Sequence, residues 1–169
     1  VPQPRSYLSK EPAVQRANRN KFDPYDQTKN RLDSLLVCGH KCDKIEFILE
    51  GGTFTEYPKP YLKKFFTQFI YCVNTYFDTE KRECRSLQEE IDYNKMAKSR
   101  IIGICIETRP DAVLEKDEDG IPWTKTLLDW GVTRIQIGVQ HVRNDILKKI
   151  NRGHTIEQAL DAIKYLKDN

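Results

Sequence analysis

The chain has 169 residues, of which 38% are hydrophobic and 31% are charged, and its formal net charge is +3. This length fits one ordinary domain or a piece of a larger one. No window holds the long apolar run that a membrane-spanning helix requires, so the composition excludes a membrane protein. Pro2, Pro4 and Arg5 stand where a secretory signal would be apolar, which argues against secretion.

Residues 1–22 are predicted to form a basic arm, separate from a folded region over 23–169. Glu11 is the single acidic residue of the arm, and Tyr7 and Phe22 are its aromatic residues. The basic residues of the arm are Arg5, Lys10, Arg16, Arg19 and Lys21. This pattern is compatible with contacts to the phosphates of a nucleic acid. A solvated and partly extended terminus is the competing interpretation.

The first elements of the folded region are a helix, a strand and a second helix. Asp23 is predicted to be an N-cap, because proline follows it and leucines then recur at helical spacing. This pattern predicts a helix that ends near Cys38. Residues 45–49 are prone to form a short strand, which runs into a glycine turn. Over 60–77, apolar residues recur every three or four positions and predict a heavily buried helix.

The middle of the chain is predicted to contain a loop, a helix and a buried strand. Residues 78–86 are polar and indicate a surface loop, which a shorter helix follows over 87–97. Residues 101–106 are nearly all apolar, as expected for a strand covered on both faces. This strand ends at the polar cluster 107–111, and a turn follows over 117–120.

The last part of the chain is predicted to contain a strand between helices. A helix over 123–130 precedes a strand over 133–139. Helices are then expected over 143–150 and 156–167, the second beginning with a capping box at Thr155.

Strands that alternate with helices indicate parallel βαβ units with right-handed crossovers, so the fold class is α/β. Two architectures fit this order: an open doubly wound sheet and a full or partial (β/α) barrel. In both, functional residues gather at the carboxyl ends of the strands. Three polar clusters follow the predicted strands here, at 50–54, 107–111 and 140–141.

The side chains of these clusters suggest ligand contacts. Gly51 and Gly52 leave backbone groups open to close approach by a ligand. The alternative is that these glycines serve the turn alone. Their spacing matches neither a P-loop nor a dinucleotide fingerprint. Glu107 and Asp111 could act as an acid–base pair or accept hydrogen bonds from ligand hydroxyls. Arg109 between them favours a structural ion pair as the alternative.

The five cysteines are an odd count without secretory features, which predicts reducing conditions and a cytoplasmic location. Cys38 and Cys42 have a C-x-x-x-C spacing, but no third cysteine lies in that loop, and an iron–sulfur cluster needs three or four thiolates. Cys105 is predicted to be a core residue. The three histidines are too dispersed for a metal site, and His154 is expected to shape the turn before the last helix. No metal ligand is therefore predicted in this chain.

Taken in order, several stretches of the sequence resemble the radical S-adenosylmethionine domain of the Elongator catalytic subunit family, the tRNA uridine acetyltransferases. The stretches that carry the resemblance are 16–27 (RANRNKFDPYDQ), 39–54 (GHKCDKIEFILEGGTF), 102–111 (IGICIETRPD), 131–141 (GVTRIQIGVQH) and 151–155 (NRGHT). The resemblance implies a partial (β/α) barrel of the radical SAM type, in which S-adenosylmethionine lies across the strand ends beside a [4Fe–4S] cluster.

The resemblance also implies roles for individual residues. The backbone of Gly51, Gly52 and Thr53 would hold the methionine amino group. Glu107 and Thr108 at the next strand end, and Gln140 at the one after, would lie near the ribose or the methionine portion. Arg152 would meet the methionine carboxylate. A zwitterionic ligand with ribose hydroxyls calls for such a set of backbone groups, acceptors and one cation.

The family reaction implies further partners. A 5′-deoxyadenosyl radical abstracts hydrogen from the acetyl group of acetyl-CoA, and the resulting carbon radical adds to carbon five of the wobble uridine of tRNA. The cofactor carries the difficult chemistry, and the protein positions it. Arg16, Arg19 and Lys21 would then belong to the tRNA surface, and Elongator-type subunits would be possible protein partners.

The sequence departs from the family pattern in three respects. The three cluster cysteines and the acetyltransferase domain are absent from this chain, and His141 stands where a small hydroxyl residue is common. The barrel is therefore expected to be incomplete at both ends, as a fragment that does not cleave S-adenosylmethionine by itself. The alternatives are a non-catalytic tRNA-binding module and an inactive subunit of an Elongator-like assembly.

Overall fold

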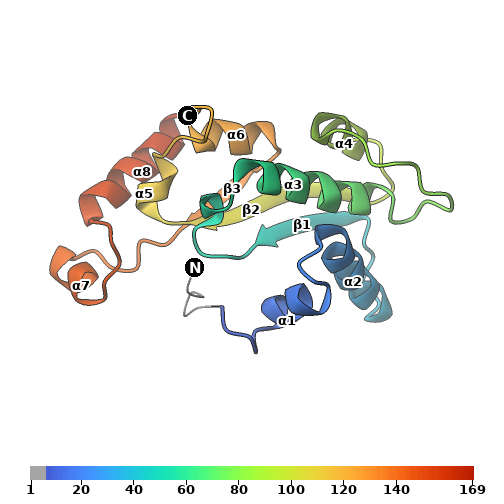
Figure 1. Ribbon diagram of the computed structural model, residues 1–169, viewed down its shortest axis with the longest axis horizontal. Helices are drawn as coiled ribbons and strands as arrows, with labels where there is room; N and C mark the ends of the chain where they lie inside the picture. Colours follow the sequence, from blue (N-terminus) through green and yellow to red (C-terminus); the bar gives the residue numbers. More distant parts are fainter. Residues whose placement is uncertain (1–6) are drawn as a thin grey trace. The chain divides into compact units, whose positions relative to one another are not determined.

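The computed structural model describes residues 7–169, so Arg5 of the basic arm lies outside the described residues (Figure 1). The helices are α1 (Pro12–Arg19), α2 (Pro24–Val37), α3 (Lys59–Asn74), α4 (Leu87–Asn94), α5 (Pro110–Val113), α6 (Trp123–Asp129), α7 (Asn144–Lys149) and α8 (Ile156–Asp168). The strands are β1 (Lys44–Leu49), β2 (Arg100–Thr108) and β3 (Arg134–Ile137), and a short 3₁₀ helix, η1, covers Phe54–Glu56. None of the helices within 7–169 is both long and apolar enough to cross a membrane.

The chain divides into two compact units. The first unit comprises Val1–Phe47 and Pro60–Ile104, and the second comprises Ile48–Lys59 and Cys105–Asn169. Both β1 and β2 contribute residues to each unit, because the divisions fall within these strands. The predicted division into a basic arm over 1–22 and one folded region over 23–169 differs from this one, and it stays a prediction.

The alternation of strands and helices that the sequence predicts is present. The sheet has the order β1-β2-β3, and β2 pairs with β3 in parallel, from Cys105 opposite Arg134 to Thr108 opposite Ile137. This is a mixed α/β fold with a three-stranded parallel sheet, consistent with a partial (β/α) barrel. Three helical segments were not predicted: α1, α5 and η1. β3 is shorter than expected, because the backbone turns beyond Ile137, where the amide of Val139 donates to its carbonyl.

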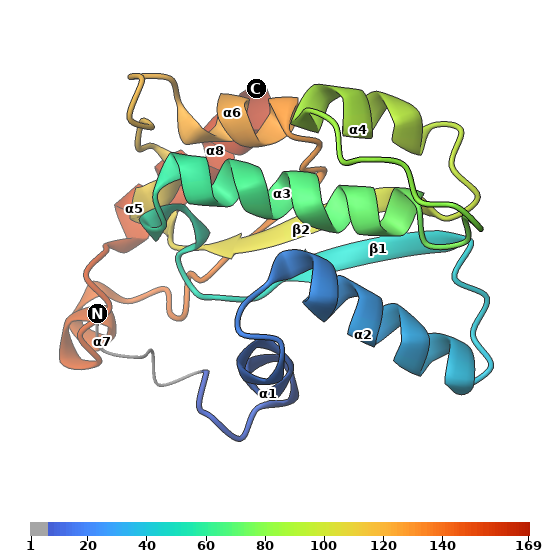
Figure 2. The same cartoon turned by 45° about the vertical axis from the view of Figure 1, so that its right-hand side comes forward.

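The core of the first unit lies between α2, α3 and β1, and Figure 2 shows both helices beside this strand. Leu32, Cys42 and Val73 are its buried centre, and partly buried side chains from β1 and β2 surround them. Phe66 and Phe69 on α3 are also buried, which confirms part of the apolar face predicted over 60–77, whereas Tyr61 and Phe77 are exposed.

The polar loop over 78–86 is fastened to α4 by a buried ion pair. Arg82 donates from Nη1 and Nη2 to the two carboxylate oxygens of Glu90, at 2.6 and 2.7 Å. Burial alone would raise the pKa of Glu90, but hydrogen bonds from Arg82, the Arg85 amide and Asn74 outweigh burial and hold the pKa below its usual range. The guanidinium group also lies over the rings of Tyr71 and Tyr93. Most residues of the loop are therefore exposed, while Arg82 anchors the loop to α4.

The second unit has an equivalent anchor at Asp117. Its carboxylate is buried and accepts hydrogen bonds from Lys59 Nζ and Thr126 Oγ1, each at 2.6 Å. The backbone amides of Asp119 and Ile121 donate to the same carboxylate at 3.0 Å. Burial alone would raise the pKa of Asp117, but these donors hold the pKa well below its usual range. The carboxylate thus ties the loop after α5 to the first residue of α3.

We expect Asp117→Ala to destabilise the protein by about 3 kcal/mol, because it removes one partner of a buried ion pair and orphans several donors. Asp129→Ala is the control, since its ion pair with Lys125 is exposed and such pairs contribute about 0.5 kcal/mol or less. Urea unfolding measures both. If Asp117→Ala lowered the free energy of unfolding no more than Asp129→Ala does, Asp117 would not anchor this loop.

The pH dependence follows from the direction of the Asp117 shift. A carboxyl whose pKa is depressed on folding contributes stability above its unfolded pKa, about 3.9, and loses it as the pH falls toward the folded value. We therefore expect the wild-type chain to lose stability below about pH 4 more steeply than Asp117→Ala. Parallel curves of unfolding free energy between pH 5 and pH 2 would contradict this expectation.

Candidate functional site

The first part of the candidate site is the turn after β1. Gly51 and Gly52 follow this strand, and Gly52 has a φ of +80°, a left-handed conformation that favours glycine. A Cβ atom added at either position would meet no heavy atom within 4 Å. The backbone of this turn therefore borders open space, as the proposed approach of a ligand requires. Thr53 follows in an extended conformation as the N-cap of η1.

The ends of β2 and β3 form the second part of the site. The amide of Gly138 donates to the carbonyl of Thr108 at 3.0 Å, which continues the parallel pairing by one residue. Arg152 Nη2 donates to the carbonyl of Gly138 at 3.3 Å. A Cβ atom at Gly138 would lie 3.0 Å from Arg152 Nη2 and 3.1 Å from Gln140 Nε2. The structure thus brings together Thr108, Gln140 and Arg152, which are far apart in the sequence.

Gly138 is a residue of this site that the sequence analysis missed. Its missing side chain is what lets Arg152 and Gln140 approach the strand end. The available signal was a glycine at the end of an apolar strand, which often marks close approach of other groups. Gln140 itself has a φ of +65°, uncommon for a residue with a side chain.

Two polar atoms at these strand ends are buried without hydrogen-bond partners. They are the hydroxyl oxygen of Thr108 and Nε of Arg152. Buried polar groups nearly always have partners, and the exceptions call for a reason. A hydroxyl and a guanidinium N–H left without partners at these strand ends suit a ligand that brings polar and negatively charged groups. Glu107, half-exposed at the end of β2, adds a carboxylate.

The Arg109–Asp111 contact supports the structural alternative for Asp111. Arg109 Nε donates to Asp111 Oδ1 at 3.0 Å, and Nη2 pairs with Oδ2. This hydrogen bonding and the charge of Asp111 raise the pKa of Arg109. Because the Asp111 carboxylate is engaged in this way, the geometry favours an ion pair over an acid–base role for it.

His154 lies in the turn before α8, where it was predicted to have a structural role. Its ring is 5% exposed, and Nε2 lies 3.2 Å from the carbonyl oxygen of Val139, so the imidazole joins this turn to the segment after β3. The other ring nitrogen, Nδ1, is buried without a partner.

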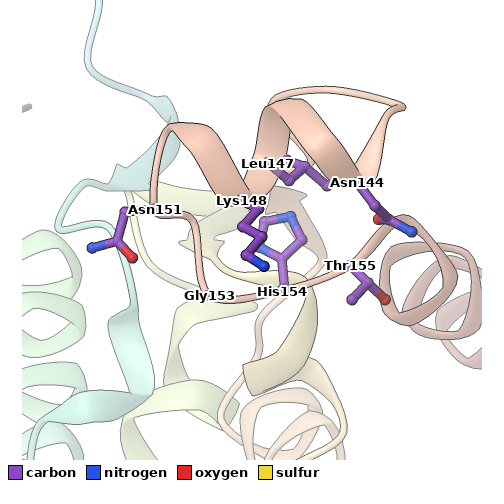
Figure 3. Close-up of a pocket in the computed structure, with 7 residues that line it drawn as sticks. All are labelled: Asn144, Leu147, Lys148, Asn151, Gly153, His154 and Thr155. Carbon is purple, nitrogen blue, oxygen red and sulfur yellow. The ribbon is translucent and has the colours of Figure 1, made fainter.

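The His154 ring lies among the residues that line a cavity of about 350 Å³ (Figure 3). The other lining residues are Asn144, Leu147, Lys148, Asn151, Gly153 and Thr155. The amide of Asn144 receives the Ile156 N–H and donates to Glu157, so the first turn of α8 is already capped. The cavity therefore does not expose an uncapped helix terminus.

The cysteines within the described residues do not form a cluster site. Cys42, Cys72 and Cys105 are buried and Cys38 and Cys84 are exposed, and no group of three or more metal-ligating side chains occurs within 7–169. Burial raises the pKa of Cys72 to about 12 and also raises that of Cys42, so neither favours the thiolate form. An iron–sulfur cluster needs three or four thiolates, and these residues do not fit one.

The residues proposed for RNA contacts lie in the first unit, at the end of α1 and in the turn after it. Arg16 and Arg19 lie one helical turn apart on α1, where Arg16 is half-buried and Arg19 exposed. Lys21 is exposed in the following turn. Part of the predicted basic arm is therefore helical rather than extended.

A comparison with protein families identifies the class of this chain. The family described as the Radical SAM superfamily matches residues 46–169. The chain belongs to this superfamily. The match covers β2 and β3, most of β1 and all of the candidate ligand residues.

Within this superfamily, the chain is similar to several individual proteins. A tRNA uridine(34) acetyltransferase of Methanocaldococcus infernus is 40% identical over 166 residues, which is 98% of this chain but 29% of that protein. Elongator complex protein 3 of Bos taurus is 35% identical over 164 residues, covering 97% of this chain and 28% of that protein. A solved structure of the archaeal Methanocaldococcus infernus Elp3 with an N-terminal deletion superposes with a TM-score of 0.74 at 38% identity, over 86% of this chain and 32% of that one. The chain thus spans less than a third of these relatives.

The two glycines of the β1 turn allow a matched test. We expect Gly52→Ala to destabilise the protein by about 1 kcal/mol, because alanine in the left-handed region is strained. Gly51→Ala, where φ is not positive and space is open, should change stability by less than about 0.5 kcal/mol. Thermal unfolding of the two variants measures the difference. Equal losses would show that the Gly52 conformation is not what the turn requires.

Proposed function

We propose that this chain is the S-adenosylmethionine-binding core of an enzyme that modifies the wobble uridine of tRNA. The observation that carries the proposal is the convergence of an open glycine turn, an unpartnered Thr108 hydroxyl and an unpartnered Arg152 N–H at the ends of parallel strands. The tRNA uridine(34) acetyltransferase and Elongator names of the relatives support the choice of substrate.

The residues at the strand ends fit the polar groups of S-adenosylmethionine. The backbone of Gly51, Gly52 and Thr53 would hold the amino group of the methionine portion. Arg152 would pair with its carboxylate, for which a guanidinium N–H is available. This fit explains why a cation and an open turn occur at one edge of the sheet.

The remaining ligand contacts would come from Glu107, Thr108 and Gln140. Glu107 and Thr108 end β2, and Gln140 follows β3, so their side chains can accept or donate hydrogen bonds to ribose hydroxyls or to the methionine portion. S-adenosylmethionine supplies the 5′-deoxyadenosyl group that serves as the hydrogen-abstracting radical in this type of chemistry. The protein's part is to bind, orient and shield the ligand.

The [4Fe–4S] cluster of the superfamily is not accounted for by residues 7–169, as the cysteine positions show. Acetyl-CoA as the source of the transferred carbon unit, tRNA as substrate and Elongator-type subunits as partners all belong to the proposal for the protein to which this chain corresponds. The basic arm over 1–22 would contribute Arg16, Arg19 and Lys21 to the tRNA surface.

A second candidate function is tRNA binding without chemistry, or a role as an inactive subunit of an Elongator-like assembly. The absence of a cysteine set within the described residues favours this alternative. The two candidates differ in one measurable respect, since only the first requires S-adenosylmethionine to bind at the strand ends.

We expect Arg152→Met to weaken S-adenosylmethionine binding by about tenfold or more, because it removes the cation facing the ligand carboxylate. Arg143→Met is the matched control, since Arg143 lies in the same unit and pairs with Asp145 at the surface. Isothermal titration measures both affinities. Absence of S-adenosylmethionine binding by the unmodified chain would overturn the ligand assignment and leave the tRNA-binding alternative.

We expect the triple variant Arg16→Glu, Arg19→Glu and Lys21→Glu to bind tRNA at least tenfold more weakly, with a smaller salt dependence, because each lost phosphate contact reduces the salt slope by about one. In the control variant, three other exposed basic residues of the first unit, Arg31, Lys41 and Lys44, are changed to Glu, so that the net charge changes by the same amount. Fluorescence anisotropy between 50 and about 200 mM salt measures the slopes. Equal weakening in both triples would contradict a localised RNA surface.

A further inference from the structure

A small pocket in the first unit combines aromatic rings with lysines. Its volume is about 190 Å³, and it lies between the turn that joins α1 to α2 and the first part of α3. The lining residues are Lys21, Phe22, Asp23, Pro24, Tyr61, Lys64 and Phe65. None of the strand-end residues assigned to S-adenosylmethionine takes part in it.

The backbone holds Phe22 at this pocket in an uncommon conformation. Lys21 and Phe22 have φ values of 50° and 60°, and two successive residues with side chains rarely adopt the left-handed region. The Phe22 amide donates to the carbonyl of Ala17 at 2.8 Å, which fixes the conformation at the end of α1. The phenyl ring remains 55% exposed. Strain of this kind is found mainly where a function requires it.

The other aromatic residues of the pocket come from α3. Tyr61 is 38% exposed, and its ring centroid is 6.3 Å from that of Phe65. The pocket therefore presents ring surfaces from two segments of the chain, Phe22 from the turn and Tyr61 and Phe65 from the helix.

The charge at the pocket is positive. Lys21 and Lys64 are both exposed, and neither takes part in an ion pair among residues 7–169. Asp23 is the acidic lining residue, but its Oδ1 accepts the Asp26 amide at 2.8 Å as the N-cap of α2. Two available cations beside aromatic rings favour a ligand that has both a flat ring and negative charge.

We propose that this pocket holds one unpaired nucleotide of an RNA, with the base stacked on Phe22 or Tyr61 and the flanking phosphates paired with Lys21 and Lys64. Stacking on aromatic side chains accepts any base, and lysines track the backbone, which is how proteins bind single-stranded nucleic acid. The inference rests on the proposed function in that the substrate is an RNA with unpaired bases. It adds a base-binding pocket to the surface cations already assigned.

The pocket chemistry disfavours other occupants. An apolar peptide segment would leave Lys21 and Lys64 without partners, and a free phosphate would make no use of three aromatic rings. An acidic peptide with an aromatic residue is the closest competitor, and the experiment includes it.

The test measures binding of the full chain to a fluorescently labelled single-stranded RNA and to tRNA. We expect the double variant Phe22→Ala and Tyr61→Ala to bind both about tenfold more weakly with an unchanged salt slope, because base stacking is lost while phosphate contacts remain. Phe22→Trp in place of Phe22→Ala should restore binding, whereas Phe22→Leu, apolar but without a π system, should not. Phe77→Ala, another exposed phenylalanine of the same unit, is the control and should bind as the wild type does.

The lysines are tested separately. Lys64→Gln should weaken binding and lower the salt slope by about one, and Lys63→Gln, its neighbour on α3 outside the pocket, should have a smaller effect. Circular dichroism and thermal unfolding of each variant establish that the chain remains folded. A nucleotide analogue such as 2-aminopurine in the RNA should show quenched fluorescence on binding to the wild type and not to the double variant.

The outcomes separate this inference from the proposed function. RNA binding that is unchanged in the double variant, or restored equally by Phe22→Leu and Phe22→Trp, overturns the stacking pocket. Binding of S-adenosylmethionine and charge reversal at Arg16 and Arg19, which do not line the pocket, still test the proposed function. Tighter binding of an acidic aromatic peptide than of RNA overturns it as well. Loss of RNA binding in the double variant with the salt slope intact supports it.

Discussion

The parallel pairing of β2 with β3 determines where the polar groups of the candidate site lie. The pairing brings Thr108 level with Ile137, and the hydrogen bond from Gly138 to Thr108 extends it to the point where both strands end. Arg152 lies so close to Gly138 that a side chain there would force it to shift, since a Cβ atom would lie 3.0 Å from Arg152 Nη2. The positions of the unpartnered Thr108 hydroxyl and Arg152 N–H therefore depend on hydrogen bonds between segments that the sequence separates widely.

Sequence patterns could predict the elements whose signals are local. The N-cap at Asp23 and the capping box at Thr155 are present in the structure, because each needs only neighbouring residues to form its hydrogen bonds. The helix α1 was missed, since the side chain of Glu11 makes no cap hydrogen bond and the segment is polar. The role of Gly138 was also not predictable, because it depends on Arg152, whose approach is a property of the folded chain.

The strand ends illustrate the same limit within the site. An apolar run that stops at polar residues correctly indicated where β1 ends, so Gly51 was found as a candidate, whereas β2 continues to Thr108, beyond the predicted 101–106. Thr108 became a candidate through the family resemblance. The pocket at Phe22 was not found, although Lys21 was, because Tyr61 and Lys64 come from a different helix. The aromatic residues of α3 were predicted to lie in the core. The burial of Phe66 and Phe69 confirms this prediction for part of that helix only.

The fastening of the 78–86 loop affects which of its bonds a protease can reach. Arg82 is held through its guanidinium by Glu90 and through its carbonyl by the hydroxyl of Tyr71, whereas Lys81 and Arg85 are exposed. Cleavage after basic residues requires a peptide segment that can leave its own hydrogen bonds and enter the protease cleft. The exposed side chains of Lys81 and Arg85 do not leave their segments free, because Lys81 Nζ donates to the hydroxyl of Tyr25 and the Arg85 amide donates to Glu90. A trypsin-like enzyme therefore meets three suitable residues in a loop whose contacts must break before any of them can enter its cleft.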